Sequence, residues 1–156
     1  MLTVSDGVSE GTREDRSGDL LDELLQREGY EVERRVVPDV RAEIARAIEE
    51  LADDGARLVL TTGGTGVAPR DVTPEATASV LERLAPGIAE AIRADSIVKT
   101  PHALLSRGIA GVRGSTLVVN LPGSPGGCRD GFAVLQPALE HALGLLAGES
   151  AGHRQT

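Results

Sequence analysis

Short runs of apolar residues alternate along the chain with longer segments in which apolar residues recur every three or four positions. The short runs lie at residues 2–5, 58–62 and 117–121, and each is continuous enough to be a buried strand. Between the first two runs, leucine, isoleucine and alanine repeat at helical spacing over residues 20–25 and 44–52. An alternation of strands and helices of this length predicts a parallel sheet with crossover helices.

Turn and cap residues mark the ends of these elements. Ser17 is a suitable N-cap for the first helix, and Gly29 ends it. Residues 30–37 are β-branched but alternate less cleanly, which predicts a more peripheral strand that ends at Pro38. The second helix is expected to end near Gly55.

The second half of the chain is more often interrupted. A helix is predicted to begin at Thr73 and to continue through Leu84, until the Pro-Gly pair at residues 86–87 breaks it. Another helix extends to about Val98, and residues 104–112 contain glycines that favour an extended or hairpin segment. The apolar face of the final helix consists of Phe132, Leu135, Leu139, Leu143 and Leu146.

The composition is that of one globular domain. The chain has 156 residues, of which 40% are hydrophobic and 26% charged, and a chain of this length buries roughly 70% of its unfolded surface without disulfides or a structural metal. With an aromatic fraction of 1%, the core has to be aliphatic. We find no internal repeat or linker, so we expect a single domain over residues 1–148 and a flexible tail over residues 149–156.

Charge and cysteine content exclude several classes of function. Lys and Arg number 16 against 24 Asp and Glu, a net charge of −8, and such an acidic chain with few aromatics is not expected to bind nucleic acid. No run approaches the roughly 18 to 20 apolar residues of a membrane span, and the N-terminus lacks signal-peptide features, so a cytoplasmic protein is expected. Cys128, the only cysteine, leaves no intrachain disulfide or thiolate-rich metal site. At the start of the last helix it is more often a packing residue than a reactive thiol.

Polar, glycine-rich or acidic loops follow four of the predicted strands. They lie at residues 5–7, 38–39, 62–66 and 120–123. In an open α/β sheet, ligands bind beyond the carboxyl ends of the strands. Each loop alone could be an ordinary turn, because turns also use Gly, Pro, Asn and Asp. Four such loops on one edge favour a binding site.

The loop at residues 61–66 reads Thr-Thr-Gly-Gly-Thr-Gly. Three glycines in four positions allow backbone N–H groups to converge on an anion, and the threonine hydroxyls add donors. The loop is neither a P-loop nor a GxGxxG motif, because no lysine follows it and no helix begins at its third glycine. It therefore predicts a phosphate site of another kind.

Two aspartates are expected beside this loop. Asp71 follows it at the start of a helix, and Asp39 ends a neighbouring strand. A carboxylate beside phosphates is favourable when it holds a divalent cation, and Mg²⁺ is commonly bound by one or two carboxylates plus substrate oxygens. The alternative is that both side chains only cap turns. Ser106 and Arg107 are candidates for a second phosphate contact, with a surface arginine as the alternative.

These motifs occur in the order typical of a known family. The sequence resembles the molybdopterin adenylyltransferase (MogA/MoaB) family, which includes the G domain of gephyrin. The segments that carry the resemblance are residues 5–6, 14–18, 37–39, 61–66, 69–77, 105–107 and 120–123. The match extends over nearly the whole chain, and its most specific part is the unit from Gly-Gly-Thr-Gly to Arg-Asp-Val-Thr-Pro.

The resemblance implies a three-layer α/β/α sandwich with a mostly parallel sheet that assembles as a homotrimer or homohexamer. It implies binding of molybdopterin and, in catalytic members, Mg²⁺-dependent transfer of AMP from ATP to the terminal phosphate of molybdopterin, with release of pyrophosphate. It assigns catalytic and metal-binding roles to Asp39 and Asp71. The implied nucleotide- and phosphate-binding residues are Thr62, Gly63, Gly64, Thr65, Gly66, Asn120, Pro122 and Gly123. The implied pterin-binding residues are Ser5, Asp6, Ser106 and Arg107.

Two alternatives to an adenylyltransferase remain. In the implied reaction the nucleophile is a phosphate of the substrate, so no nucleophilic side chain is required. The sequence agrees with this, because it shows no Ser-His or Cys-His pair typical of nucleophilic catalysis. A non-catalytic molybdopterin-binding module of the same fold is the first alternative, and the presence of both aspartates argues against it. A stand-alone relative of molybdate-inserting or pyrophosphatase-associated domains is less favoured, because those domains usually occur within longer chains.

Overall fold

A computed structural model describes residues 1–148 of the chain. Over those residues, a six-stranded sheet forms in the order β2-β1-β3-β6-β5-β4. The strands are β1 (Leu2–Val4), β2 (Arg35–Val37), β3 (Leu58–Thr62), β4 (Arg83–Leu84), β5 (Ala110–Arg113) and β6 (Thr116–Leu121). Strands β2, β1, β3 and β6 pair in parallel, whereas β5 pairs antiparallel with both of its neighbours. The sheet is therefore mostly parallel, as predicted.

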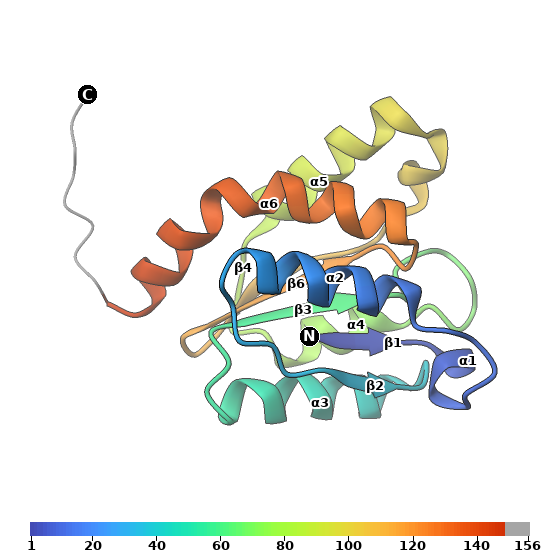
Figure 1. Cartoon of the computed structure of the whole chain (residues 1–156), viewed down its shortest axis with the longest axis horizontal. Coiled ribbons are helices and arrows are strands. Elements are labelled where there is room, and N and C mark those ends of the chain that lie inside the picture. The colour runs from blue at the N-terminus through green and yellow to red at the C-terminus, as the bar shows by residue number, and fades with distance from the viewer. Residues whose placement is uncertain (149–156) are drawn as a thin grey trace.

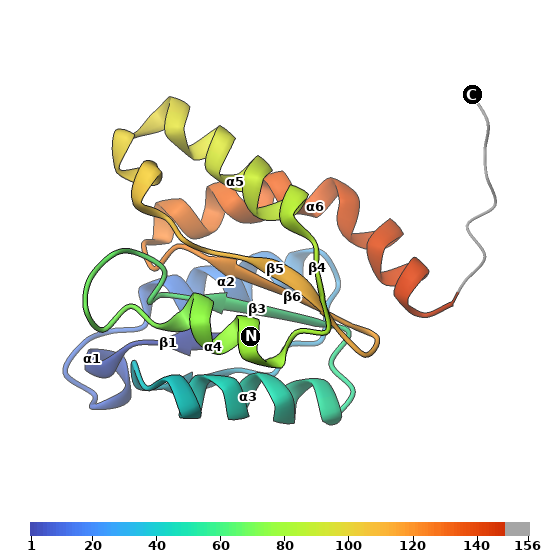
Figure 2. The ribbon, with the colours of Figure 1, turned by 180° about the vertical axis from the view of Figure 1, so that it is seen from behind.

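Helices cover both faces of this sheet (Figure 1). The helices are α1 (Asp6–Ser9), α2 (Arg16–Arg27), α3 (Arg41–Asp53), α4 (Thr73–Val80), α5 (Pro86–Lys99) and α6 (Pro125–Leu146), with a 3-10 helix η1 (Pro101–Leu105). Helices α2, α5 and α6 lie over one face, and α3 and α4 lie over the other, as the view from behind also shows (Figure 2). The expected three-layer α/β/α sandwich is confirmed.

Two apolar clusters, one on each face of the sheet, join the layers. In β6, Leu117 and Val119 belong to the cluster beneath α2, α5 and α6, whereas Val118 belongs to the cluster beneath α3 and α4. Successive side chains of a strand point to opposite faces, so a strand covered on both sides needs a continuous apolar run. Most of the buried cluster residues are aliphatic, and Phe132 is their aromatic member.

Most of the predicted elements are confirmed. The apolar run at residues 58–62 is β3 with the same bounds, and the helical spacings over residues 20–25 and 44–52 lie within α2 and α3. The glycine-interrupted segment of residues 104–112 contains the end of η1 and most of β5, which forms a hairpin with β6. Residues 149–156, the expected tail, lie outside the described part of the chain.

The prediction is wrong around residue 84. Helix α4 ends at Val80, and Leu84 belongs to β4, where it pairs with Gly111. Pro86 begins α5 and does not simply end the preceding helix, because proline is tolerated in the first helical turn. Pairing with β5, a contact distant in sequence, therefore decides the structure of this segment.

Two helix and strand boundaries also differ from the prediction. The N-cap of α2 is Asp15, whose carboxylate accepts a hydrogen bond from Gly18 N at 3.0 Å, and Ser17 is inside the helix. Of residues 30–37, the last three form β2 at the edge of the sheet. Within residues 1–148, no helix combines the length and the apolar character needed to cross a membrane.

Candidate functional site

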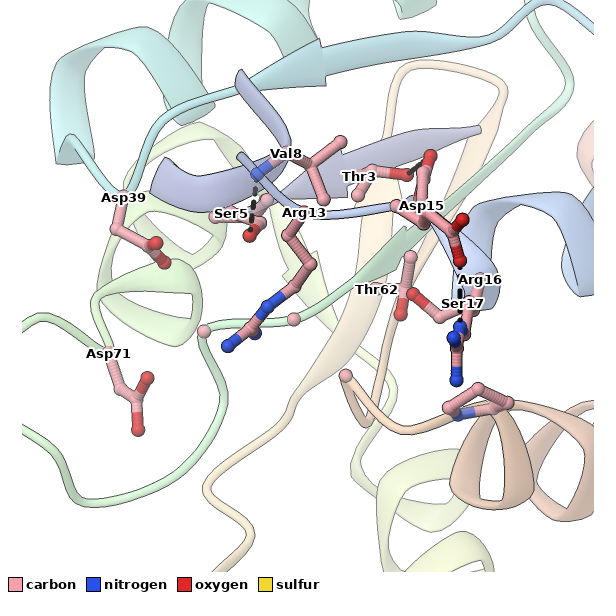
Figure 3. Close-up of a pocket in the computed structure, with 16 residues that line it drawn as sticks. Thr3, Ser5, Val8, Arg13, Asp15, Arg16, Ser17, Asp39, Thr62 and Asp71 are labelled. Carbon is pink, nitrogen blue, oxygen red and sulfur yellow. Dashed lines mark hydrogen bonds and ion pairs between the residues drawn. The ribbon is translucent and has the colours of Figure 1, made fainter. Parts of the chain in front are cut away.

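A cavity of about 760 Å³ opens beyond the carboxyl ends of β1 and β3 (Figure 3). The chain leaves β1 toward β2 on one side and later returns to β3 on the other, so the order of strands reverses at this point. Such a switch point is where open α/β sheets bind ligands. The cavity is lined by Thr3, Val4, Ser5, Val8, Arg13, Glu14, Asp15, Arg16, Ser17, Asp39, Thr62, Gly63, Gly64, Asp71, Gly123 and Pro125.

The glycine turn after β3 has a backbone shape that other residues would not tolerate. Gly63 and Gly64 have φ values of +100° and +64°, in the left-handed region that glycine adopts without strain. A Cβ at Gly63 would overlap the carbonyl oxygen of Val4, and one at Gly64 would overlap the hydroxyl of Thr73. The predicted phosphate loop is therefore a tight turn packed directly against the end of β1.

Helix α4 and the loop after β6 hold this turn in place. The hydroxyl of Thr73 donates a hydrogen bond to Gly63 O at 2.9 Å, and its N–H donates to Gly64 O at 3.1 Å. The hydroxyl of Thr62 donates to Pro122 O at 2.9 Å. All three bonds lie within the fold and involve no charged group, so the turn keeps its shape without ion pairs.

Asp39 is fixed by a reciprocal pair of hydrogen bonds with Asp6. Asp6 N donates to Asp39 Oδ2 at 2.9 Å, and Asp39 N donates to Asp6 Oδ1 at 2.9 Å. Arg70 donates to both oxygens of Asp6, at 2.6 and 2.8 Å. Hydrogen bonds from Arg70 and then from the Asp39 backbone lower the pKa of Asp6. Asp6, assigned to pterin binding from the sequence, thus braces Asp39 and Arg70 and is not one of the cavity-lining residues.

Asp71 lies in the loop that precedes α4 and also lines the first cavity. Its Oδ2 accepts a hydrogen bond from Ala68 N at 3.0 Å, so the predicted turn-capping role is present. Within residues 1–148, Oδ1 of Asp71 and Oδ1 of Asp39 have no hydrogen-bond partner. Figure 3 shows the two carboxylates on the same side of the cavity. The Oδ2 atoms are thus occupied, by Ala68 N at Asp71 and by Asp6 N at Asp39, and one oxygen of each carboxylate is left for a ligand.

Glycines provide the space in which these two carboxylates lie. A Cβ at Gly64 would come within 3.1 Å of Asp39 Oδ1, and a Cβ at Gly66 would come within 2.8 Å of Asp71 Oδ2. The loop of residues 63–66 therefore touches both aspartates. Two carboxylates and a backbone turn converge in this part of the cavity.

Asp39 and Asp71 are carboxylates of the first cavity that could hold a divalent cation. In the part of the chain that the structure describes, no cluster of three or more His, Cys, Asp or Glu side chains is arranged to hold a metal. Mg²⁺ usually keeps several waters and binds one or two protein carboxylates together with substrate phosphates. Asp39 and Asp71 would supply those carboxylates, with no need for a closed cage of protein ligands.

Asn120 is not at the cavity, although it was assigned to phosphate binding. Its side chain is buried and donates to the hydroxyls of Thr61, at 3.0 Å, and Thr77, at 2.9 Å. Its side-chain oxygen Oδ1 accepts a hydrogen bond from Ile109 N at 3.2 Å. These bonds tie β6 to β3 and α4, so the Asn120 side chain lies within the fold and lines neither cavity that contains the other predicted site residues.

A second cavity, of about 440 Å³, lies on the other side of the glycine loop. Four residues assigned to the site from the sequence line it: Thr65, Gly66, Ser106 and Pro122. The rest of its wall comes mainly from α5, η1 and the start of α6, including Ile92 and Leu105. Most of the predicted site residues therefore line one of two cavities that share the loop of residues 62–66, whereas Asp6, Asn120 and Arg107 line neither.

Arg107 lines neither of these cavities. Its guanidinium donates to Gly66 O at 2.7 Å and to Asp71 O at 2.6 Å, and it pairs with the carboxylate of Glu75. The hydrogen bond from Arg107 lowers the pKa of Glu75. The contacts of Arg107 in this structure are with other parts of the fold, and its expected phosphate or pterin contact stays a prediction.

No site residue was predicted within the segment of residues 13–17, which forms one wall of the first cavity. Asp15 is mostly buried and accepts from Thr3 Oγ1 at 2.8 Å and from Arg34 Nη2 at 3.0 Å. Figure 3 shows Arg13 extending into the cavity between the Asp39–Asp71 side and the Asp15–Ser17 side. The sequence could have indicated this segment by its position, because it follows β1 at the edge of the sheet where ligands bind.

Cys128 packs behind the first cavity. Its Sγ lies 3.1 Å from both Thr62 Oγ1 and Pro122 O. Burial raises the pKa of the Cys128 thiol to about 11. A protonated, buried thiol is a packing residue, which agrees with the expectation from the sequence.

Comparison with known proteins gives consistent results. The family model described as a probable molybdopterin binding domain matches residues 1–141. Gephyrin from Dictyostelium discoideum is 42% identical, and the match covers 94% of this chain but 22% of that protein. The molybdopterin adenylyltransferase of Helicobacter pylori strain J99 is 38% identical, with 95% of this chain and 86% of that protein covered. The chain thus spans about a fifth of the gephyrin and most of the adenylyltransferase.

A solved structure supports the same relationship. The molybdopterin biosynthesis enzyme MoaB from Thermus thermophilus is 48% identical and superposes with a TM-score of 0.88, covering 94% of each chain. This similarity in sequence and structure extends over nearly the whole chain. It agrees with the family that the sequence motifs indicate.

Proposed function

The chain belongs to the probable molybdopterin binding domain family, and from that premise we propose that it is a molybdopterin adenylyltransferase. The proposed reaction transfers AMP from ATP to the terminal phosphate of molybdopterin and releases pyrophosphate. The observation that carries the proposal is the convergence of Asp39, Asp71 and the glycine turn at the first cavity. Relatives that bear the name molybdopterin adenylyltransferase support it.

The reaction makes few demands on protein groups as reactants. A phosphate oxygen of molybdopterin attacks the α-phosphorus of ATP, one P–O bond forms, and the bond to the β-phosphate oxygen breaks as pyrophosphate leaves. The protein has to align the two phosphates and neutralise their charge. The buried Cys128 is not needed as a nucleophile, because the nucleophile belongs to the substrate.

Residues of the first cavity would divide these tasks. The backbone of the glycine turn would orient the nucleotide phosphates, and the free Oδ1 atoms of Asp39 and Asp71 would hold Mg²⁺. The bound ion would supply positive charge where negative charge accumulates on the transferring group. Arg13 would add a positive charge at the same cavity.

The second cavity is the proposed place for the pterin. Its wall includes apolar side chains such as Ile92 and Leu105, and Ser106 adds a hydroxyl. A flat heterocycle needs this combination of apolar surface and a few polar groups. The glycine loop lies between the two cavities, so a pterin phosphate directed toward this loop would approach the nucleotide.

We also propose self-association as a homotrimer or homohexamer. Large apolar side chains remain exposed on α5 and η1, among them Val98 at 86% and Leu104 at 68%. Covering such side chains in an interface between copies would remove apolar surface from water. Sedimentation of a monomer at micromolar concentration would contradict this proposal.

The decisive experiment is an assay with purified molybdopterin, ATP and Mg²⁺. We expect adenylylated molybdopterin and pyrophosphate in equal amounts, and no product when EDTA replaces Mg²⁺. Molybdopterin binding without AMP transfer would favour the non-catalytic module. A failure to bind molybdopterin at all would contradict both functions.

A further inference from the structure

Arg107 closes the neck of the loop that carries Asp71. Its Nε donates to Gly66 O at 2.7 Å, and its Nη2 donates to Asp71 O at 2.6 Å. These two carbonyls are the two ends of the loop of residues 66–71. One planar guanidinium therefore fixes the separation of both ends of this loop.

The same arginine is itself anchored on both sides of the loop. Its side chain pairs with the carboxylate of Glu75 in the first turn of α4, through Nη1 and, at 3.4 Å, through Nη2. Its backbone N–H donates to Thr65 O at 2.8 Å. The contacts of Arg107 thus connect the glycine loop, the Asp71 loop and α4.

These contacts leave little capacity for a ligand. A guanidinium has five N–H donors, and four hydrogen bonds to Gly66, Asp71 and Glu75 use most of them. The contacts are geometrically specific, because they need the planar fork of an arginine. Arg107 is therefore built into the fold and not presented to the cavities.

The position of the Asp71 carboxylate depends on this loop. Its Oδ2 accepts from Ala68 N inside the loop and packs against Gly66, where a Cβ would come within 2.8 Å. A wider neck would displace Ala68 and Gly66 relative to Asp71. The direction of the carboxylate toward the cavity would change with them.

We propose that Arg107 is a positioning residue that holds Asp71 toward the first cavity by closing the neck of the loop of residues 66–71. This inference rests on the proposed function, in which Asp71 acts on a metal-bound nucleotide. It gives this arginine a role other than the phosphate or pterin contact that was a candidate from the sequence.

The test compares Arg107→Met and Arg107→Lys with a matched control, Arg113→Met. Arg113 donates to Val80 O at the opposite end of α4 and pairs with Glu49, so it is also an arginine that ties this helix to the sheet. We expect Arg107→Met to lower kcat about tenfold to a hundredfold, as small displacements of reacting groups do. The KM for molybdopterin should stay nearly unchanged, and Arg113→Met should keep the wild-type kcat.

Two further readouts separate positioning from general destabilisation. We expect amide hydrogen exchange within residues 66–71 to accelerate in Arg107→Met and not in Arg113→Met. The affinity for Mn²⁺ in the presence of ATP, measured by electron paramagnetic resonance, should fall in Arg107→Met alone. Arg107→Lys should behave like Arg107→Met, because one ammonium group cannot reproduce the fork.

Each outcome decides the proposal. A folded Arg107→Met variant with wild-type kcat and Mn²⁺ affinity would overturn it, as would a raised KM for molybdopterin with kcat unchanged, which would indicate direct pterin contact. If Arg107→Met does not fold, Glu75→Gln removes the anchor of the guanidinium and should give the same changes at smaller size. If the wild-type protein transfers no AMP, the proposed function fails, and hydrogen exchange with Mn²⁺ binding still decides whether Arg107 positions Asp71.

Discussion

Two neighbouring loops shape the first cavity, and they are held by different forces. The turn at Gly63 and Gly64 is fixed by backbone conformation, by close packing against Val4 and by uncharged hydrogen bonds. The following loop, residues 66–71, is held by the charged side chains of Arg107 on one side and Arg70 on the other. Packing and backbone geometry respond weakly to salt and pH, whereas ion pairs respond to both.

The difference matters because the two loops have different proposed tasks. A turn that orients phosphates through its backbone needs a constant shape, which steric packing provides. The loop of residues 66–71 would bring a carboxylate to a metal ion. Its charged contacts can change in strength when a metal ion and phosphates bind in the cavity. The comparison predicts that substitutions in the turn affect folding first, and that substitutions around the loop affect turnover first.

The largest expected effect is that of Gly63→Ala. The added Cβ would overlap the Val4 carbonyl, and φ at +100° is strained for alanine. We expect a loss of about 3 kcal/mol or more in the free energy of unfolding, measured by urea denaturation. The control is Gly87→Ala at the start of α5, where an added Cβ has open space and alanine favours the helix. Equal stability of the two variants would contradict the steric account of the turn.

Asp71→Asn should leave the fold intact and reduce turnover. Asparagine retains an acceptor for Ala68 N but removes the negative charge that would attract Mg²⁺. Loss of such a contact costs about 3 kcal/mol of transition-state stabilisation, which is about a hundredfold in kcat. Partial rescue by excess Mg²⁺ is expected.

If Asp71 only caps its turn, the same variant should show a lowered melting temperature with nearly normal turnover. Measuring both quantities on one preparation therefore separates the two roles. Near-normal kcat would contradict the proposed catalytic role of Asp71.

Arg70→Met should have a smaller effect than Asp71→Asn. Arg70 is largely exposed and pairs with Asp6, which braces Asp39. Exposed ion pairs contribute little to stability, so the melting temperature should barely change. We expect a few-fold reduction in kcat, and a salt dependence of kcat that is weaker in the variant than in the wild-type protein. An unchanged salt dependence would show that this ion pair does not affect the site.

Acid should loosen the charged loop before it affects the glycine turn. Contacts with Arg70 and Arg107 lower the pKa values of Asp6 and Glu75 below their ordinary values of 3.8 and 4.5. A lowered carboxyl pKa means that the stabilisation is present above the ordinary value and is lost as pH falls through the folded-state pKa. We expect full protection at neutral pH and a loss that begins below about pH 4.

Hydrogen exchange at a series of pH values measures this last effect. After correction for the intrinsic rate at each pH, protection within residues 66–71 should fall earlier than protection of β3. Simultaneous loss in both segments would show that the two loops are not held separately.

The local pattern of apolar and polar residues was sufficient to predict much of the fold. The run at residues 58–62 begins with three aliphatic residues because β3 is covered on both faces, and such a run is typical of a buried strand. β4 was missed because it has two exposed residues and exists through pairing with β5. No periodicity within residues 83–84 could indicate a partner nearly thirty positions away.

The candidate site also has a part that local sequence could predict and a part that it could not. Gly63 and Gly64 could be predicted because a left-handed, tightly packed turn requires glycine itself. The environments of Asn120 and Arg107 could not, because an amide or a guanidinium suits a phosphate and a protein carbonyl equally well. Which of these it contacts depends on segments that fold against it, such as Thr77 for Asn120 and Glu75 for Arg107.

The loops of residues 62–66 and 122–127 each face both cavities. Thr62 and Gly123 line the first cavity, whereas Thr65 and Pro122 line the second. The two cavities are therefore separated by little more than one backbone turn. A single molecule that joined a fragment in each cavity by a short linker over this turn would bind its second half intramolecularly, with affinity gains of about 10²–10⁴ over either fragment. The backbone turn between the cavities thus defines the path that the linker of a two-site inhibitor has to follow.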